Sequence, residues 1–324
     1  MNTTTLDRRS PRFVQSRLVD PVAEIEAART GLLAEPASIA PKYFYDRLGS
    51  TLFEAITELP EYYPTRTEAA IFTEHASAMA QTIGGGMVLI DLGAGNCAKA
   101  ARLFPLFEPH RYIAIDVSVE FLREALRRLQ REHPQLDMAG LGQDFSADLE
   151  LPAAWVEGAR PVFFYPGSSI GNFAADEALA FLQRIRGKAE GGGLLIGVDL
   201  VKPKAVLDAA YDDALGVTAA FNLNALRHLN GVIGSDFQPA DWRHVAFYDA
   251  ERCRVEMHLE ARGRTEVAWP GGGRRFAAGD RIHTENSCKY TVEGFTALLG
   301  AAGFSTPRCW TDRQGWFAVF WAPC

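Results

Sequence analysis

The chain has 324 residues, of which 48% are hydrophobic and 23% charged, with a formal net charge of −7 and a pI near 5.6. A chain of this size and composition buries a sizeable core, in one large domain or two interleaved ones. The acidic balance argues against a nucleic-acid partner, because phosphate backbones are bound by basic surfaces. The N-terminus lacks the apolar core of a signal peptide, and no apolar run approaches the ~20 residues of a membrane span.

Cysteine and histidine usage points to a reduced protein without a metal centre. The five cysteines are scattered and form no C-x-x-C pair, which is typical of a cytoplasmic protein. The seven histidines show no spacing typical of metal ligands, so no bound metal is expected. The turn GSSIGN lacks the geometry expected of a nucleophile elbow, which argues against a serine hydrolase. We expect a cytoplasmic monomer that contacts neither membrane nor nucleic acid.

The N-terminal part begins with a polar stretch at residues 1–13, for which mobility rather than an ordered element is expected. Apolar residues at helical spacing then predict a first helix over 21–33. Another helix is predicted over 64–80, with Thr65 or Thr67 as its N-cap. Between these helices, tyrosines lie beside prolines and glycines, and their rings either pack as amphipathic surface or present hydroxyls to a polar pocket. These tyrosines are Tyr43, Tyr45, Tyr62 and Tyr63.

The segment 87–99, MVLIDLGAGNCAK, is the stretch around which the rest is arranged. A short, continuously apolar run is typical of a strand covered on both faces. Gly93 and Gly95 follow it and let a ligand approach the backbone at the start of a helix. The G-x-G pattern also fits dinucleotide binding, with Ala98 in its third position, so the loop alone leaves the nucleotide-like ligand open.

Acidic residues end the next two predicted strands. Strand 111–118 carries Asp116, about 20 residues beyond the glycine loop, where such folds place a ribose-binding acid. A carboxylate there can accept hydrogen bonds from both ribose hydroxyls, although an acid at a strand end can equally cap a helix. Strand 138–145 ends in Asp144 and Phe145, which could bind an adenine amino group and ring or simply form a turn.

The following elements complete a parallel series. Strand 161–169 runs into the turn GSSIGN, which places Asn172 at the same edge of the sheet as the glycine loop. The predicted helices lie at 119–132 and 175–189, and a further strand at 192–200. This alternation indicates an α/β fold with right-handed crossovers.

The alternation of strands and helices ends after residue 200. Residues 203–230 are predicted to be helical and contain Tyr211, and 254–262 and 281–290 look like strands of an added subdomain. The chain returns to a helix at 292–303 and two closing strands at 305–311 and 316–322. A parallel sheet closed by a C-terminal hairpin favours a methyltransferase over a dehydrogenase.

Several motifs resemble the histidine Nα-methyltransferase family of ergothioneine biosynthesis. They are YFYDRLGSTLFEAITELPEYYPTRTE, LGAGNCAK, GSSIGN, AYDDALGVTAAFNLNALRHLN and HTENSCKY, and they span nearly the whole chain. The resemblance implies a class I Rossmann-like methyltransferase sheet with an inserted second α+β domain. It implies a substrate-binding domain of residues 14–65 and 202–290, and a cofactor-binding domain of residues 66–201 and 291–324.

The resemblance also implies roles for particular residues. It assigns S-adenosylmethionine to Gly93, Gly95, Lys99, Asp116, Asp144 and Phe145. It assigns the backbone groups of the amino acid to Tyr62, Asn172 and Tyr211, with Tyr45 nearby as the catalytic candidate, and the imidazole to Glu285, Ser287 and Met257. Glu285 and Ser287 are two residues apart on a predicted strand, so both should leave the same face. Taken alone, Glu285 could be a surface carboxylate and Met257 a core residue.

The expected activity is therefore threefold methylation of the α-amine of L-histidine by S-adenosylmethionine, giving hercynine. Three alternatives remain open from the sequence. They are N-methylation of another aromatic amino acid, a Rossmann-type oxidoreductase that binds NAD, and a catalytically idle ligand-binding homologue.

Overall fold

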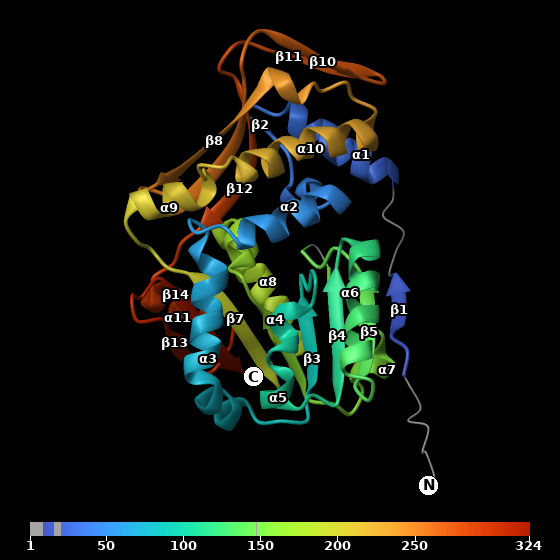
Figure 1. Cartoon of the computed structure of the whole chain (residues 1–324), viewed down its shortest axis with the longest axis vertical. Helices are drawn as coiled ribbons and strands as arrows, with labels where there is room; N and C mark the ends of the chain where they lie inside the picture. The colour runs from blue at the N-terminus through green and yellow to red at the C-terminus, as the bar shows by residue number, and fades with distance from the viewer. Residues whose placement is uncertain (1–8, 16–20, 147) are drawn as a thin grey trace.

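The computed structural model of the chain describes residues 9–15, 21–146 and 148–324. Its main element is an eight-stranded sheet of order β1-β5-β4-β3-β6-β7-β14-β13, in the lower half of Figure 1. The strands are β1 (Arg12–Gln15), β3 (Val88–Leu92), β4 (Arg111–Asp116), β5 (Asp137–Gly142), β6 (Pro161–Tyr165), β7 (Gly193–Asp199), β13 (Arg308–Thr311) and β14 (Phe317–Pro323). Strands β1 and β3 to β7 are parallel, and β14 runs antiparallel to β7 and β13. The predicted α/β class and C-terminal hairpin are confirmed.

Helices cover both faces of this sheet (Figure 1). They are α3 (Tyr63–Ile83), α4 (Ala98–Ala101), α5 (Phe104–Phe107), α6 (Val119–Glu132), α7 (Ala153–Val156), α8 (Ala175–Lys188) and α11 (Val292–Ala301). The sequence of strand β3 is continuously apolar because both faces of the strand are buried. Ile90 joins the core on one face of the sheet, and Leu89 joins the core on the other. The central strands are thereby fixed in place, and the loops at their carboxyl ends are held at one edge.

A second layer sits across that edge, in the upper half of Figure 1. It contains a four-stranded sheet of order β2-β12-β9-β8 and a separate β10-β11 hairpin. Its strands are β2 (Ala37–Ser38), β8 (Trp242–Asp249), β9 (Arg254–Ala261), β10 (Thr265–Trp269), β11 (Gly272–Phe276) and β12 (Arg281–Cys288). Its helices are α1 (Pro21–Leu33), α2 (Arg47–Thr57), α9 (Lys204–Tyr211) and α10 (Val217–Ile233). One hydrophobic core joins residues between Ala28 and Tyr63 to residues between Leu207 and Ile282.

Short 3₁₀ helices occupy three connections, η1 (Pro41–Phe44), η2 (Ser169–Asn172) and η3 (Pro239–Asp241). Among the described residues, no helix is long and apolar enough to cross a membrane.

The structure corrects the expectation for the N-terminal stretch. Residues 1–8 lie outside the described residues, but Arg12 and Phe13 belong to β1, which pairs with β5. The guanidinium of Arg12 donates to Asp137 at 3.0 Å, and the Phe13 ring lies under the guanidinium of Arg123 at 3.9 Å. These contacts come from distant segments, so the local polarity of the stretch gave no indication of a strand.

Two predicted helices differ in their ends. Helix α3 begins at Tyr63 with Tyr62 in the N-cap position, so the predicted Thr65 or Thr67 cap is wrong. Pro64 in the first helical turn permits this earlier start, because its missing N–H has no helical partner there. The predicted helix 203–230 is two helices, since Asp212 leaves the helical backbone after Tyr211 with φ −142° and ψ 68°, and α10 begins only after Gly216. Strands β8, β10 and β11 were not predicted.

Candidate functional site

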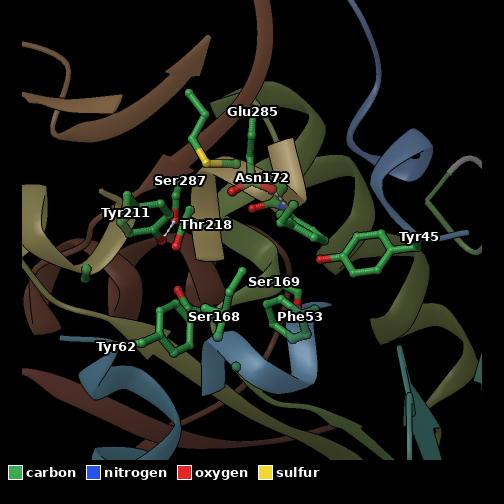
Figure 2. Close-up of a pocket in the computed structure, with 15 residues that line it drawn as sticks. Tyr45, Phe53, Tyr62, Ser168, Ser169, Asn172, Tyr211, Thr218, Glu285 and Ser287 are labelled. Atoms are coloured by element: carbon green, nitrogen blue, oxygen red, sulfur yellow. Dashed lines mark hydrogen bonds between the residues drawn. The ribbon is translucent and has the colours of Figure 1, made fainter. Parts of the chain in front are cut away.

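All seven residues predicted to face the substrate line one pocket between the two layers. They are Tyr45, Tyr62, Asn172, Tyr211, Met257, Glu285 and Ser287, and Figure 2 labels six of them. The empty space between these side chains, counted out to the solvent at the mouth of the pocket, is about 520 Å³. Its remaining walls are residues that the sequence did not single out: Phe53, Ile56, Gly167, Ser168, Ser169, Ala210, Thr218 and Phe221. Several of these residues lie in motifs that resemble the family, and membership of those motifs was the one sign in the sequence that they belong to the site.

Strand β12 brings Glu285 and Ser287 onto one wall. Their positions two apart direct both side chains into the pocket, as the strand period predicts, and both are buried. Glu285 lies opposite Met257 on β9, immediately after a register shift that begins at His283. Because this irregularity precedes both residues, their shared face is preserved.

Glu285 is a buried carboxyl with little hydrogen-bond support. Burial raises its pKa to about 7, and the positive charge of Lys289 partly opposes that rise. Its contact with the Asn172 amide is long, with Nδ2 at 3.5 Å from Oε2 (Figure 2). An acceptor with unused lone pairs therefore faces the pocket, and its charge changes near neutral pH.

The tyrosines around the pocket are protonated donors rather than bases. Burial raises the pKa of Tyr45 well above its ordinary value, and the charges of Glu285 and Asp116 raise it further. Tyr45 is thus electrostatically coupled to the substrate wall and to the acid at the end of β4. Burial likewise raises the pKa of Tyr62. The hydroxyl of Tyr211 donates to Ser287 Oγ at 2.6 Å, so Tyr211 reaches the Glu285–Ser287 wall.

The loop after β3 adopts the conformation that its glycines permit. Gly93 has φ 71° and Gly95 φ 52°, and a Cβ built on Gly95 would meet nothing within 4 Å. Asp116 Oδ2 accepts from the Gly95 N–H at 2.9 Å, and Oδ1 accepts from the Ser118 N–H at 2.8 Å. Each carboxylate oxygen keeps acceptor capacity, so two adjacent ribose hydroxyls can still bind there. The open backbone and this acid fit a nucleoside ligand.

Asp144 and Phe145 lie beyond the end of their strand rather than within it. Strand β5 ends at Gly142, shorter than the predicted 138–145. The Phe145 ring lies 3.7 Å from the Cβ position of Gly93, so it borders the glycine loop. Asp144 accepts from the Ser146 backbone N–H at 3.0 Å, which is the turn alternative that the sequence left open. The structure therefore brings Phe145 to the loop and gives Asp144 a local turn bond.

Lys99 forms an ion pair that the sequence did not predict. Its Nζ lies 2.7 Å from Glu68 Oε2, and Glu68 is buried in α3. The other oxygen of Glu68 accepts from the Gly167 N–H at 2.8 Å. Glu68 thus ties the helix after the glycine loop to the loop after β6. Within the described part of the chain, no group of three or more side chains has metal-binding geometry.

Helix α2 of the second layer closes over the glycine loop from above. Glu54 Oε1 accepts from the Asn96 amide at 2.6 Å, and the hydroxyls of Ser50 and Ser118 lie 3.3 Å apart. The pocket and the glycine loop therefore share a boundary, with Tyr45 near both.

A Rossmann-like sheet with a C-terminal antiparallel hairpin, a glycine loop after β3 and an acid at the end of β4 defines a class I S-adenosylmethionine-dependent methyltransferase. Residues 25–324 match the family described as histidine-specific, S-adenosylmethionine-dependent methyltransferases, and the chain belongs to this family.

Relatives cover most of the chain. It is 38% identical over 299 residues to a histidine N-alpha-methyltransferase of Mycolicibacterium smegmatis, covering 90% of this chain and 92% of that protein. It is 33% identical to ergothioneine biosynthesis protein 1 of Neurospora crassa, covering 85% of this chain and 32% of that protein. A magnesium protoporphyrin IX methyltransferase structure from Synechocystis PCC 6803 has a TM-score of 0.44 at 12% identity, with coverage of 88% and 97%.

Proposed function

We propose that this protein transfers three methyl groups to the α-amino nitrogen of L-histidine, which gives hercynine in ergothioneine biosynthesis. The observation that carries the proposal is the pocket wall on which Glu285 and Ser287 stand side by side. An imidazole ring offers one N–H and one bare nitrogen, and this wall offers a carboxylate acceptor and a hydroxyl. The family and the full-length relatives support the same substrate.

The remaining polar groups hold the other end of the amino acid. We assign the carboxylate and α-amine to Asn172, Tyr62 and Tyr211, which line the pocket beside the ring-binding wall. Met257 lies opposite Glu285 across the strand pair and covers the ring with an apolar surface. With both ends held, the α-nitrogen rather than the ring is directed towards the cofactor side.

Tyr45 is assigned as the catalytic residue that orients the α-amine. S-adenosylmethionine supplies an electrophilic methyl group, and the amine must be neutral to accept it. Because its pKa is raised, the Tyr45 phenol keeps its proton and acts through a hydrogen bond, while water takes the proton that leaves the α-ammonium before each methyl transfer. Aromatic faces in the pocket, including Phe53 and Phe221, accommodate a quaternary ammonium product by cation–π attraction.

The cofactor is assigned to the glycine-loop side. Asp116 binds the ribose hydroxyls, Phe145 packs against the adenine, and Asp144 accepts from its amino group. Gly93 and Gly95 let the backbone approach the ligand, and Lys99 binds the amino-acid end.

We further propose the division into a substrate domain of 14–65 and 202–290 and a cofactor domain of 66–201 and 291–324. The separate core of the upper layer supports it, although residues 14 and 15 pair with the main sheet in β1. A monomer in a reducing cytoplasm is proposed as well, where an exposed thiol such as Cys253 stays reduced.

Mass spectrometry of a reaction with histidine and excess S-adenosylmethionine tests the activity. The expected product carries three added methyl groups, which fragmentation places on the α-nitrogen. Ring-methylated histidine, or turnover of tryptophan but not of histidine, would overturn the proposal. Replacing S-adenosylmethionine by NAD in a thermal-shift measurement provides the control, since only the methyl donor should raise the Tm.

A further inference from the structure

A buried cluster of charged side chains lies directly behind the β12 wall of the pocket. It consists of Asp199 at the end of β7, Lys202 just after it, and Lys289 just after β12, all at most 1% exposed. Each lysine forms an ion pair with the single aspartate. The cluster therefore carries one net positive formal charge, and only Lys289 reaches the pocket residues.

The ammonium of Lys289 uses all of its donors. Nζ lies 2.9 Å from Asp199 Oδ2, 2.9 Å from the Tyr211 hydroxyl and 2.8 Å from Ser287 Oγ. An ammonium has three N–H groups and no acceptor, so both hydroxyl oxygens must accept from it. Burial alone would lower the pKa of Lys289, but Asp199 beside it raises the pKa above its ordinary value. Lys289 is therefore a permanent donor.

This arrangement determines the direction of the hydroxyl protons. The Tyr211 hydroxyl donates to Ser287 Oγ at 2.6 Å. Ser287 Oγ then has both acceptor sites filled, one by Tyr211 and one by Lys289. Among the described residues nothing accepts the remaining proton of Ser287, and the side chain faces the pocket. Ser287 can therefore only donate to a ligand.

We infer that Lys289 is a positioning residue which fixes Ser287 as the hydrogen-bond donor of the pocket, with Glu285 beside it as the acceptor. This inference rests on the proposed function, because it explains how the same site reads a histidine ring. One donor and one acceptor match a neutral imidazole, which has one bare nitrogen and one N–H. Against a phenyl ring, the Ser287 donor and the Glu285 acceptor are both left without a partner. Against an imidazolium, the Ser287 donor faces a second N–H donor.

The test compares two lysines that share Asp199. Lys289→Met and Lys202→Met each remove one positive charge and leave Asp199 with one lysine, but only the first removes donors from Ser287 and Tyr211. Calorimetric titration of histidine in the presence of S-adenosylhomocysteine should show at least tenfold weaker binding for Lys289→Met. Lys202→Met should stay within twofold of wild type, and kcat at saturating histidine should change much less than KM in Lys289→Met.

Two further variants separate donation from folding and charge. Lys289→Gln keeps two amide N–H donors without the charge, and we expect it to recover histidine affinity to within about threefold. In a Ser287→Ala background, Lys289→Met should weaken histidine binding much less than it does in the wild-type background, because only its bond to Tyr211 remains to be lost. Unchanged affinity for S-adenosylhomocysteine serves as the check on folding in each variant.

The outcomes distinguish this inference from the proposed function. If wild type neither binds nor methylates histidine, the proposed function fails and this inference with it. If wild type does both, yet Lys202→Met loses as much affinity as Lys289→Met, the cluster acts through charge or packing and the inference alone is wrong. Independent, additive effects of Lys289→Met and Ser287→Ala would overturn it in the same way.

Discussion

Replacing Glu285 by glutamine removes the charge of the proposed ring acceptor while keeping its shape. The side chain is 8% exposed and has a pKa of about 7, so most of it is ionised at pH 8. Glutamine retains an acceptor oxygen in nearly the same place. The variant therefore tests the effect of the negative charge separately from the effect of having an acceptor at this position.

The magnitude follows from the kind of hydrogen bond that is exchanged. A bond to a charged partner contributes about 1.5–3 kcal/mol, and a neutral one about 0.5–1.5 kcal/mol. The difference of about 1–1.5 kcal/mol corresponds to a roughly tenfold change in affinity. At pH 8 we expect Glu285→Gln to raise the KM for histidine about tenfold and to leave that for S-adenosylmethionine unchanged, because the residue is assigned to the ring alone.

The pH dependence provides a second readout, and its sign is fixed by the raised pKa. Wild type gains the ionised acceptor as pH rises through about 7, so its histidine affinity should increase from pH 6 to pH 8. The glutamine variant lacks this titration, although both proteins share the titration of the substrate ring. The difference in histidine KM between wild type and Glu285→Gln should therefore become smaller towards pH 6.

Initial-rate kinetics at pH 6 and pH 8 check both expectations. Glu256→Gln is a matched control, because Glu256 lies on the neighbouring strand β9 and does not line the pocket. Equal rises in the KM values of both substrates, or the same ratio of wild type to variant at each pH, would show that Glu285 is structural rather than a ring acceptor.

Two further expectations concern the cofactor side and a helix end. Asp116→Ala should weaken S-adenosylhomocysteine binding at least 100-fold in calorimetry, since two charge-assisted bonds of about 1.5–3 kcal/mol each are lost; unchanged affinity would refute the ribose assignment. Asp213→Ala should lower the unfolding free energy by about 0.5–2 kcal/mol at pH 7, because Asp213 caps α10 through the N–H groups of Val217 and Thr218. The lowered pKa of Asp213 means that this contribution is present above its unfolded pKa near 3.8 and is lost as pH falls through the folded value, so denaturation curves of the two proteins should converge in acid.

The parts of the fold that follow from local pattern were predictable. An apolar run, two glycines and an acid about 20 residues later identify β3, its loop and the end of β4, because each depends on residues close in sequence. The resemblance to the family collected seven residues into one pocket, six of them from the quoted motifs and Met257 from outside them, although their positions range from Tyr45 to Ser287. Local strand spacing then accounted for the shared face of Glu285 and Ser287.

Features that depend on tertiary contacts were not predictable. Nothing local shows that Asp199 and Lys289 meet, or that Lys99 pairs with Glu68 in α3, because these pairs join distant segments in the buried interior. A lysine two residues after Ser287 on a predicted strand was the one available signal, since it should share the face of Ser287. The pairing of β1 with β5 was not predictable either, because it also joins segments that are distant in the sequence.

The core of the upper layer has a consequence for synthesis of the chain. Residue Ala37 in β2 pairs with Ile282 in β12, and α1 and α2 pack against elements that follow Leu207. During translation, apolar side chains such as Leu32 and Phe44 stay exposed until most of the chain has been synthesised, because the residues that bury them come late in the sequence. Closing so long a loop slows assembly. Premature termination after β7 would leave this surface bare, and the nascent fragment would be a substrate for chaperones or a seed for aggregation.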